Sequence, residues 1–186
     1  MDKGLAKYID RILFTQEQIQ DRIEALGHQI TEDYKDQNAD LLLVGILKGA
    51  VIFMAALMNE IDLDVEIDFM AVSSYGANTV SSGDIRILKD LDQKIMGKDI
   101  LVIEDIIDSG YTMDYLKKNL LSRGANSVKV AVLLDKPANR AVEIPVDYVG
   151  FESPDAYVVG YGMDFNQKLR NLPFIGTLNP IYYKKN

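Results

Sequence analysis

Uninterrupted apolar runs and spaced apolar stripes alternate along the chain. Residues 41–46, 100–103 and 128–134 are almost entirely apolar, which is typical of strands buried on both faces of a parallel sheet. Looser apolar patterns indicate further strands at residues 64–73, 85–91 and 146–151. The chain therefore contains enough strand-like segments for one sizeable sheet.

Apolar positions with helical spacing lie between these strands. Residues 15–18, Thr-Gln-Glu-Gln, form a capping box, and a stripe with spacings of three and four follows at Ile19, Ile23, Leu26, Ile30 and Tyr34. Residues 50–58 suit a buried helix, and residues 113–120 suit another that stops at Arg123-Gly124. Strands that alternate with helices predict an α/β fold, with a twisted, mostly parallel sheet and helices on both faces.

The most unusual stretch is residues 104–112, Glu-Asp-Ile-Ile-Asp-Ser-Gly-Tyr-Thr, which ends an apolar run. Glu104, Asp105 and Asp108 crowd three carboxylates at a buried strand end, where unpaired charge is costly. The turn and helix start that follow offer hydroxyls and backbone N–H groups suited to a phosphate. Together they suggest a phosphorylated sugar as ligand. The alternative is a solvated acidic strand end with an ordinary helix cap.

Two lysines lie where other strands are expected to end. Lys48 stands next to Gly49, between an apolar run and a buried helix, and would form a second anion site. Its alternative is a lysine whose stem lies on apolar surface while the ammonium reaches water. Lys136 follows the run at 128–134, where an ordinary exposed charge explains it equally well. Ligands of open α/β sheets bind at this edge.

Composition narrows the class of site. The 186 residues suit a single domain, and the net charge of −8 disfavours non-specific nucleic-acid binding. The chain has no cysteine and one histidine, so a metal would be a hard ion held by oxygens, and Mg²⁺ fits. The longest apolar stretch, 41–58, has Lys48 near its centre, so we expect no membrane span and a cytoplasmic protein.

Residues 104–112 resemble the phosphoribosyl pyrophosphate (PRPP) signature of the type I phosphoribosyltransferases. The form Glu-Asp-Ile-Ile-Asp-Ser-Gly is most similar to the 6-oxopurine branch, the hypoxanthine-guanine enzymes, and the likeness runs in the expected order from Leu41 to Leu178. It implies purine salvage: transfer of 5-phosphoribosyl from PRPP to N9 of hypoxanthine or guanine, giving IMP or GMP and pyrophosphate. It also implies one domain, 1–186, with a core at about 37–150 and a hood at about 151–186 joined by N-terminal residues.

The same resemblance implies how PRPP is held. Glu104 and Asp105 would bind the ribose hydroxyls and Mg²⁺. The 5′-phosphate would be bound by the loop Asp108, Ser109, Gly110, Tyr111 and Thr112. Asp108 would also be the general base that accepts the N7 proton of the purine. Closure over the site would come from a mobile loop that contains Ser74 and Tyr75, before the polar residues 77–84; a disordered hairpin tip explains that polar stretch equally well.

Pyrophosphate and purine would be bound by the remaining motifs. Lys48 and Gly49 would bind pyrophosphate, with a cis bond before the lysine in many family members, and Arg170 would bind it from a short helix shared with Asp164. Asp164, which belongs to the purine-binding segment, would hold a second Mg²⁺ near the pyrophosphate, through water or directly. Tyr157 would stack on the base, where many relatives carry Phe, and the Val158 backbone would bind its edge. Lys136 would donate to the O6 and N7 side of the purine, and donation to the exocyclic oxygen favours 6-oxopurines over 6-aminopurines.

Three other activities fit the same motifs: a xanthine-preferring phosphoribosyltransferase, a PRPP-sensing regulator that binds RNA or DNA, and a sugar-phosphate-binding module without turnover. The negative charge counts against the second, and the intact Asp108 and Lys48 count against the third. The expected partners are therefore PRPP and a 6-oxopurine, with no nucleic acid and no membrane. The resemblance also implies a homodimer or homotetramer.

Overall fold

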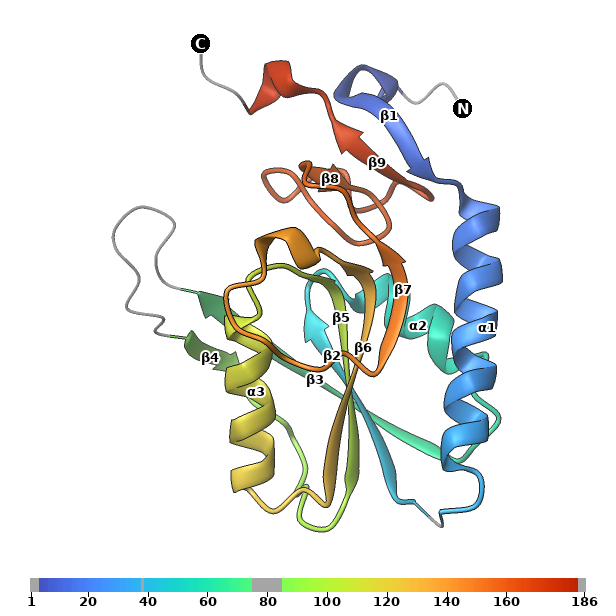
Figure 1. Ribbon diagram of the computed structural model, residues 1–186, viewed down its shortest axis with the longest axis vertical. Helices are drawn as coiled ribbons and strands as arrows, with labels where there is room; N and C mark the ends of the chain where they lie inside the picture. The colour runs from blue at the N-terminus through green and yellow to red at the C-terminus, as the bar shows by residue number, and fades with distance from the viewer. Residues whose placement is uncertain (1–3, 38, 75–84, 184–186) are drawn as a thin grey trace.

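A six-stranded sheet forms the centre of the molecule (Figure 1). The computed structural model describes residues 4–37, 39–74 and 85–183. The sheet order is β4-β3-β2-β5-β6-β7, and its strands are β2 (Leu41–Leu47), β3 (Val65–Ser74), β4 (Ile85–Lys89), β5 (Asp99–Ile107), β6 (Ser127–Asp135) and β7 (Tyr148–Glu152). Among these strands β4 alone pairs antiparallel with its neighbour. The predicted mostly parallel sheet is confirmed.

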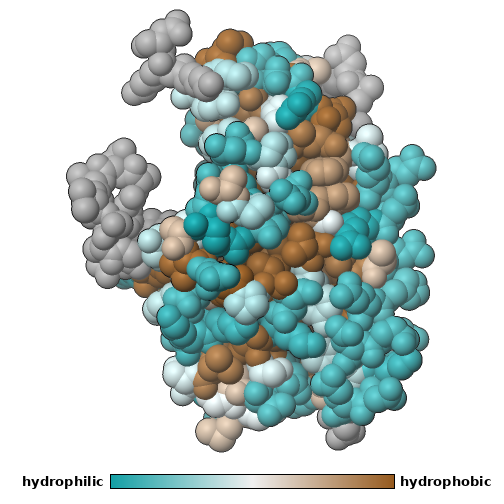
Figure 2. All heavy atoms as spheres, viewed as in Figure 1, coloured by the Kyte–Doolittle hydropathy of each residue, from teal (hydrophilic) through white to brown (hydrophobic). Residues whose placement is uncertain are grey.

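Helices cover both faces of the sheet, as predicted. The helices α1 (Gln16–Tyr34) and α2 (Val51–Met58) pack in one apolar core, whereas α3 (Tyr111–Ser122) packs in the core on the opposite face. The capping box at the start of α1 is present, and the whole predicted stripe of this helix is buried. The outward side of α1 is hydrophilic (Figure 2). Within the described ranges, no helix is long and apolar enough to cross a membrane.

A second, three-stranded antiparallel sheet lies beyond the carboxyl ends of the parallel strands (Figure 1). Its order is β1-β9-β8, formed by β1 (Ile9–Phe14), β9 (Ile175–Leu178) and β8 (Val158–Val159). The sheet has an apolar core of its own around Val159, Leu169, Leu172 and Leu178. Short 3₁₀ helices η1 (Ala6–Tyr8), η2 (Pro137–Asn139) and η3 (Pro180–Tyr182) complete the fold. Strands from both ends of the chain thus pair over one edge of the main sheet.

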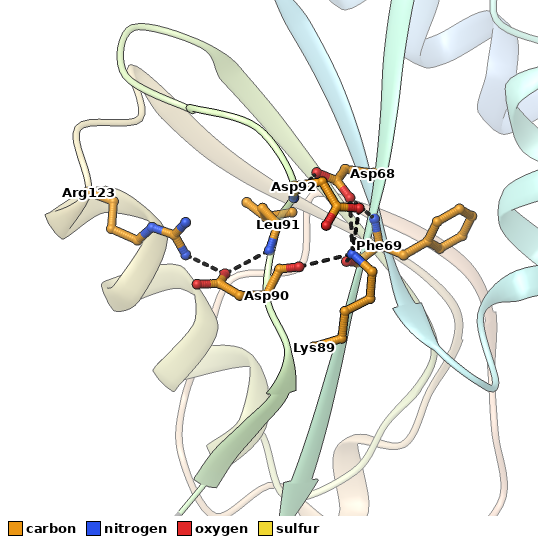
Figure 3. Close-up of polar contacts among 7 residues, drawn as sticks. All are labelled: Asp68, Phe69, Lys89, Asp90, Leu91, Asp92 and Arg123. Carbon is orange, nitrogen blue, oxygen red and sulfur yellow. Dashed lines mark hydrogen bonds and ion pairs between the residues drawn. The ribbon is translucent and has the colours of Figure 1, made fainter.

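The edge strand β4 is tied to the body by a polar network (Figure 3). The Asp68 side chain is buried and accepts a hydrogen bond from the backbone N–H of Asp92 at 2.8 Å. Lys89 Nζ lies 3.5 Å from Asp68 and 3.0 Å from Asp92. Arg123, which follows α3, pairs with Asp90 at 2.7 Å. Because the buried carboxylate of Asp68 is paired, its burial is tolerated, and the network holds β4 against β3 and α3.

Candidate active site

The acidic stretch lies at the carboxyl edge of the main sheet. Glu104 and Asp105 stand near the end of β5, and α3 begins at Tyr111. Gly110 joins the two elements with φ of 88°, in the left-handed region that glycine adopts without strain. A Cβ atom at this position would also meet the carbonyl oxygen of Val142 at 2.6 Å. The tight strand-to-helix turn therefore requires glycine for conformation and for space.

A cavity of about 310 Å³ opens at this turn. Its lining is almost continuous in sequence: Glu104, Asp105, Ile106, Ile107, Asp108, Ser109, Gly110, Thr112 and Met113. The carbonyl oxygen of Ser109 accepts hydrogen bonds from the N–H groups of Ala141 and Val142, at 2.9 and 3.0 Å, which braces the turn. Carboxylates and a helix start therefore line one cavity, an arrangement suited to a ligand that carries both hydroxyls and a phosphate.

The two adjacent carboxyls share a poorly solvated position. Burial raises the pKa of Glu104 well above its usual value, and the neighbouring charge of Asp105 raises it further. Burial also raises the pKa of Asp105, although hydrogen bonds from Glu104 and from the Ile106 backbone, and the charge of Arg170, oppose that rise. An approaching cation or hydroxyl donor would stabilise the ionised form of both carboxyls. The pair is thus prepared for such a ligand.

The loop after β2 lies directly against these acids. Its Leu47–Lys48 peptide bond is cis. A Cβ atom on Gly49 would overlap the carboxylate of Asp105. Gly162, with φ of 105°, packs against the same loop, since a Cβ atom there would overlap the carbonyl oxygen of Gly49. Glycine at both positions therefore lets three separate segments of the chain converge.

A second cavity, of about 240 Å³, adjoins the first and shares Asp105, Ile106 and Asp108 with it. The rest of its lining comes from the residue after β6, the β7–β8 connection, the start of β8 and the turn after β8: Lys136, Ala156, Tyr157, Val158, Met163 and Asp164. Lys136, Tyr157, Val158 and Asp164, which the family likeness singled out for the purine, therefore meet in one cavity. Asp108 lies at the boundary between the two cavities.

The lysine of this second cavity is buried and paired. Lys136 is 9% exposed, and its Nζ lies 3.2 Å from Asp155 Oδ1 and 3.4 Å from the carbonyl oxygen of Ala156. The hydrogen bond from Lys136 is the main cause of a lowered pKa at Asp155. Asp155 follows Ser153-Pro154 in a polar connection. An acid in a turn carries no signal for a lysine nineteen residues earlier, so the pair became visible only in the fold.

The ring of Tyr157 is fixed from its sides and remains 41% exposed. It packs edge-on against Phe165, with centroids 5.7 Å apart, and at a tilt against Tyr183 at 5.4 Å. Its hydroxyl donates to the carbonyl oxygen of Asp164 at 3.4 Å. Burial raises the pKa of Tyr157. An oriented aromatic ring with an exposed surface beside a cavity suits stacking on a planar ligand.

Asp164 and Arg170 do not lie on a helix, and that expectation was wrong. Residues 160–172 form consecutive turns and isolated bridges. Asn166 and Gln167 both have positive φ, 50° and 62°, as the central pair of a two-residue hairpin loop does. A right-handed helix cannot pass through two such residues. The turns nevertheless bring the two side chains together, with Arg170 Nη2 2.6 Å from Asp164 Oδ1.

Lys48 and Arg170 form a small cationic cluster around the side chain of Gln167. Arg170 Nη1 donates to the Gly162 carbonyl at 2.7 Å. The side-chain oxygen of Gln167 accepts from Lys48 Nζ at 3.3 Å and from Arg170 Nη2 at 3.4 Å. The backbone N–H of Gln167 donates to Asp164 at 2.7 Å. Gln167 could not be found from the sequence alone, because a polar side chain in a turn is common. An anion that displaced this amide oxygen would meet two cations at once.

Comparison with known proteins shows which family the chain belongs to. A model described as a phosphoribosyl transferase domain matches residues 12–166. A hypoxanthine-guanine phosphoribosyltransferase of Bacillus subtilis is 51% identical over 176 residues, which cover 95% of this chain and 97% of the relative. The chain belongs to the hypoxanthine-guanine phosphoribosyltransferase family. A member from Mycobacterium avium is 49% identical over 95% of this chain and 89% of its own. The crystal structure of a hypoxanthine phosphoribosyltransferase from Staphylococcus aureus is 45% identical, with a TM-score of 0.94 over 100% of both chains.

Some residues expected from the family likeness stand apart from the two cavities. Tyr75 and the side chain of Ser74 lie outside the described residues. Tyr111 begins α3, but the residue is 46% exposed and lines neither cavity. Any contact that Tyr111 makes with a ligand in the first cavity would therefore come from its backbone N–H. Lys48, Gly49 and Arg170 line neither cavity and adjoin them through Asp105 and Asp164.

Members of this family generally use Mg²⁺, and the donor set fits such an ion. Glu104, Asp105 and Asp164 supply carboxylate oxygens at the two cavities. Within the described ranges no cluster of three or more acidic, histidine or cysteine ligands forms a closed metal site. Mg²⁺ usually keeps several waters and binds one or two carboxylates together with substrate phosphates. An open pair of acids with raised pKa values beside an anion site suits that mode of binding.

Proposed function

We propose that the protein transfers the 5-phosphoribosyl group of PRPP to N9 of hypoxanthine or guanine, forming IMP or GMP and pyrophosphate in purine salvage. The observation that carries this proposal is the pair of adjoining cavities that share Asp105, Ile106 and Asp108. The first cavity is polar and is lined in part by the start of α3. The second cavity is lined by a lysine and an aromatic ring. A sugar phosphate and a base bound in these cavities would meet at their shared wall.

PRPP is assigned to the first cavity. Glu104 and Asp105 bind the ribose hydroxyls, and their negative charge favours a developing oxocarbenium ion at C1. Backbone N–H groups and hydroxyls of the loop from Asp108 to Thr112, which includes Ser109, Gly110 and Tyr111, bind the 5′-phosphate. The support is the loop's place at a helix start, where an anion is stabilised by the peptide dipoles.

Pyrophosphate is assigned to the convergence of loops beside Asp105. Lys48 and the Gly49 backbone bind it from one side, and Arg170 binds it from the other. The fork of donors on Arg170 suits an oxyanion better than a point charge does. We also propose that Ser74 and Tyr75 help to exclude water from the bound substrates.

The purine is assigned to the second cavity. Tyr157 stacks on the ring system, the Val158 backbone binds its edge, and Lys136 donates to O6. Asp108, at the boundary of the cavities, accepts the N7 proton as N9 attacks C1. A donor at O6 selects 6-oxopurines, because a 6-amino group would place a donor against a donor.

The family's metal would be held by Glu104 and Asp105, with Asp164 near the pyrophosphate side. When bound, Mg²⁺ would supply positive charge for the departing pyrophosphate. The protein's own part is to orient the oxygens of the substrate around these carboxylates.

We also propose an assembly and a setting. The small β1-β9-β8 sheet serves as a hood over the two cavities, since β8 follows Tyr157 directly. On the family likeness alone, the protein is a homodimer or homotetramer and works in the cytoplasm on small-molecule substrates. Sedimentation or light scattering that detects only monomer at all protein concentrations would remove the assembly proposal.

A spectrophotometric assay of the purified protein tests the reaction. We expect nucleotide formation from hypoxanthine and guanine that needs PRPP and is abolished by EDTA. A faster reaction with xanthine than with either base would replace the substrate assignment. PRPP binding without turnover on any base would overturn the enzymatic proposal in favour of a PRPP sensor.

A further inference from the structure

The ammonium group of Lys136 is held by acceptors from one short connection. Between Glu152, which ends β7, and Val158, which begins β8, the carboxylate of Asp155 lies 3.2 Å from Lys136 Nζ. The carbonyl oxygen of Ala156 accepts from the same nitrogen at 3.4 Å. An ammonium group has three N–H donors, so these acceptors leave one donor for the cavity that Lys136 lines.

The connection is anchored just before Asp155 and at Asp155 itself. The backbone N–H of Ser153, a buried residue, donates to the carbonyl oxygen of Asp135 at 2.7 Å. Asn139 Nδ2 donates to Asp155 Oδ1 at 3.2 Å. Asp155 therefore joins the segment that follows β6 to the connection that carries the Tyr157 ring.

Burial differs sharply between the two charged partners. The Lys136 side chain is 11% exposed, whereas that of Asp155 is 69% exposed. The hydrogen bonds from Lys136 and Asn139 lower the pKa of Asp155, so its carboxylate is ionised at neutral pH. Asp155 is not part of the lining of the second cavity. Any influence of Asp155 on a bound base would therefore pass through Lys136.

We propose that Asp155 is a positioning residue for base recognition: its carboxylate holds the Lys136 ammonium against the β7–β8 connection, so that one N–H faces the 6-oxo group. This inference rests on the proposed function, because it assigns the remaining donor to the purine. Asp105, Asp108 and Asp164 line the same cavity, so their carboxylates are alternative partners for the ammonium. Without Asp155, the flexible stem of Lys136 would let the ammonium turn toward them and away from the base.

The test compares Asp155→Asn with the wild type by initial rates at saturating PRPP. We expect the KM for hypoxanthine to rise about two- to fivefold, the effect of losing a solvent-exposed ion pair, with kcat and the KM for PRPP unchanged. Asp155→Glu keeps the carboxylate on a longer stem and should recover part of the loss. Equal hypoxanthine KM values for wild type and Asp155→Asn would overturn the proposal.

Asn139→Ala is the matched control, because it removes the other hydrogen bond of Asp155 and leaves the ion pair in place. We expect its KM for hypoxanthine to equal that of the wild type. A rise in this KM as large as that of Asp155→Asn would show that the conformation of the β7–β8 connection, and not the ion pair with Lys136, controls base binding. That result would overturn the proposal. A wild type inactive on hypoxanthine and guanine would end the proposed function and this inference together. An active wild type with an unaffected Asp155→Asn variant would end the inference alone.

Discussion

Gly49 lies in direct contact with Asp105: a Cβ atom on residue 49 would overlap the Asp105 carboxylate. The contact joins the loop after β2 to the acidic end of β5, and these two strands pair in parallel, with Gly45 opposite Ile103. The groups proposed to bind pyrophosphate and ribose therefore belong to one packed sheet edge. Their spacing is set by the main sheet itself.

Gly49→Ala tests this contact. The added methyl group must displace either the Asp105 carboxylate or the loop that carries Lys48, and a displacement of about 1 Å at a reaction centre can cost about 10²-fold in rate. We expect a loss of that order in kcat/KM for PRPP, measured by initial rates. Gly97→Ala is the control, because no atom lies within 4 Å of a Cβ there. Because Gly97 has a positive φ of 81°, alanine at this position strains the backbone without any steric clash. Full activity of Gly49→Ala would contradict the account.

Asp108→Asn separates proton transfer from substrate binding. The amide keeps the shape of the side chain but cannot accept a proton, so we expect turnover of hypoxanthine to fall about 10²- to 10⁴-fold. PRPP binding, measured at equilibrium by calorimetry, should be nearly unchanged because the loop backbone remains. Near-normal turnover would reject Asp108 as the general base.

Arg170→Lys tests the proposed pyrophosphate clamp. Arg170 contacts the Gly162 carbonyl through Nη1 and the Asp164 carboxylate through Nη2, and lysine lacks this planar fork of two donor nitrogens. Losing one charge-assisted hydrogen bond of about 1.5–3 kcal/mol would raise the KM for PRPP about tenfold or more. The KM for hypoxanthine should stay constant. A rise in the purine KM with an unchanged PRPP KM would move Arg170 to the purine side of the site.

Glu104→Gln should stabilise the ligand-free protein increasingly as pH rises. Burial and the Asp105 charge raise the folded-state pKa of Glu104 above its ordinary value of 4.5, so the folded protein holds this proton more tightly than the unfolded chain. The stability from Glu104 is therefore fully present below pH 4.5 and is lost as pH rises through the raised pKa. Glu104→Gln has no carboxyl to ionise at this position, so its stability does not fall with pH for this reason.

Thermal melts between about pH 5 and pH 8 measure this effect. The Tm of Glu104→Gln minus that of the wild type should grow with pH. Glu143→Gln, which changes an exposed carboxyl, should follow the wild type at every pH. A Tm difference for Glu104→Gln that stays constant or shrinks with pH would contradict the burial argument.

The centre of the fold could be predicted from the sequence because its strands are buried on both faces. The cores of β2, β5 and β6 appear as apolar runs, and such runs need no knowledge of partners. The strands of the small sheet are different. β1 pairs with β9 across most of the chain length, and local pattern carries no information about that pairing.

Part of the site could likewise be predicted from the sequence, and part could not. The acids and lysines at strand ends could be found because charge beside an apolar run is conspicuous. The turns around Asp164 could not, since Gln167 and Leu169 adopt positive φ, a conformation that their residue types rarely take. The partners Asp155 and Gln167 also escaped notice, because each acts on a lysine that is distant in sequence.

The most direct test of the central claim is the PRPP-dependent rate with hypoxanthine and with adenine, measured in parallel with wild type and Lys136→Ala. The account predicts fast nucleotide formation from hypoxanthine, little from adenine, and a much smaller difference between the bases in the variant. Equal rates with both bases in the wild type, or an unchanged preference in Lys136→Ala, would contradict the claim that this site recognises a 6-oxopurine through Lys136.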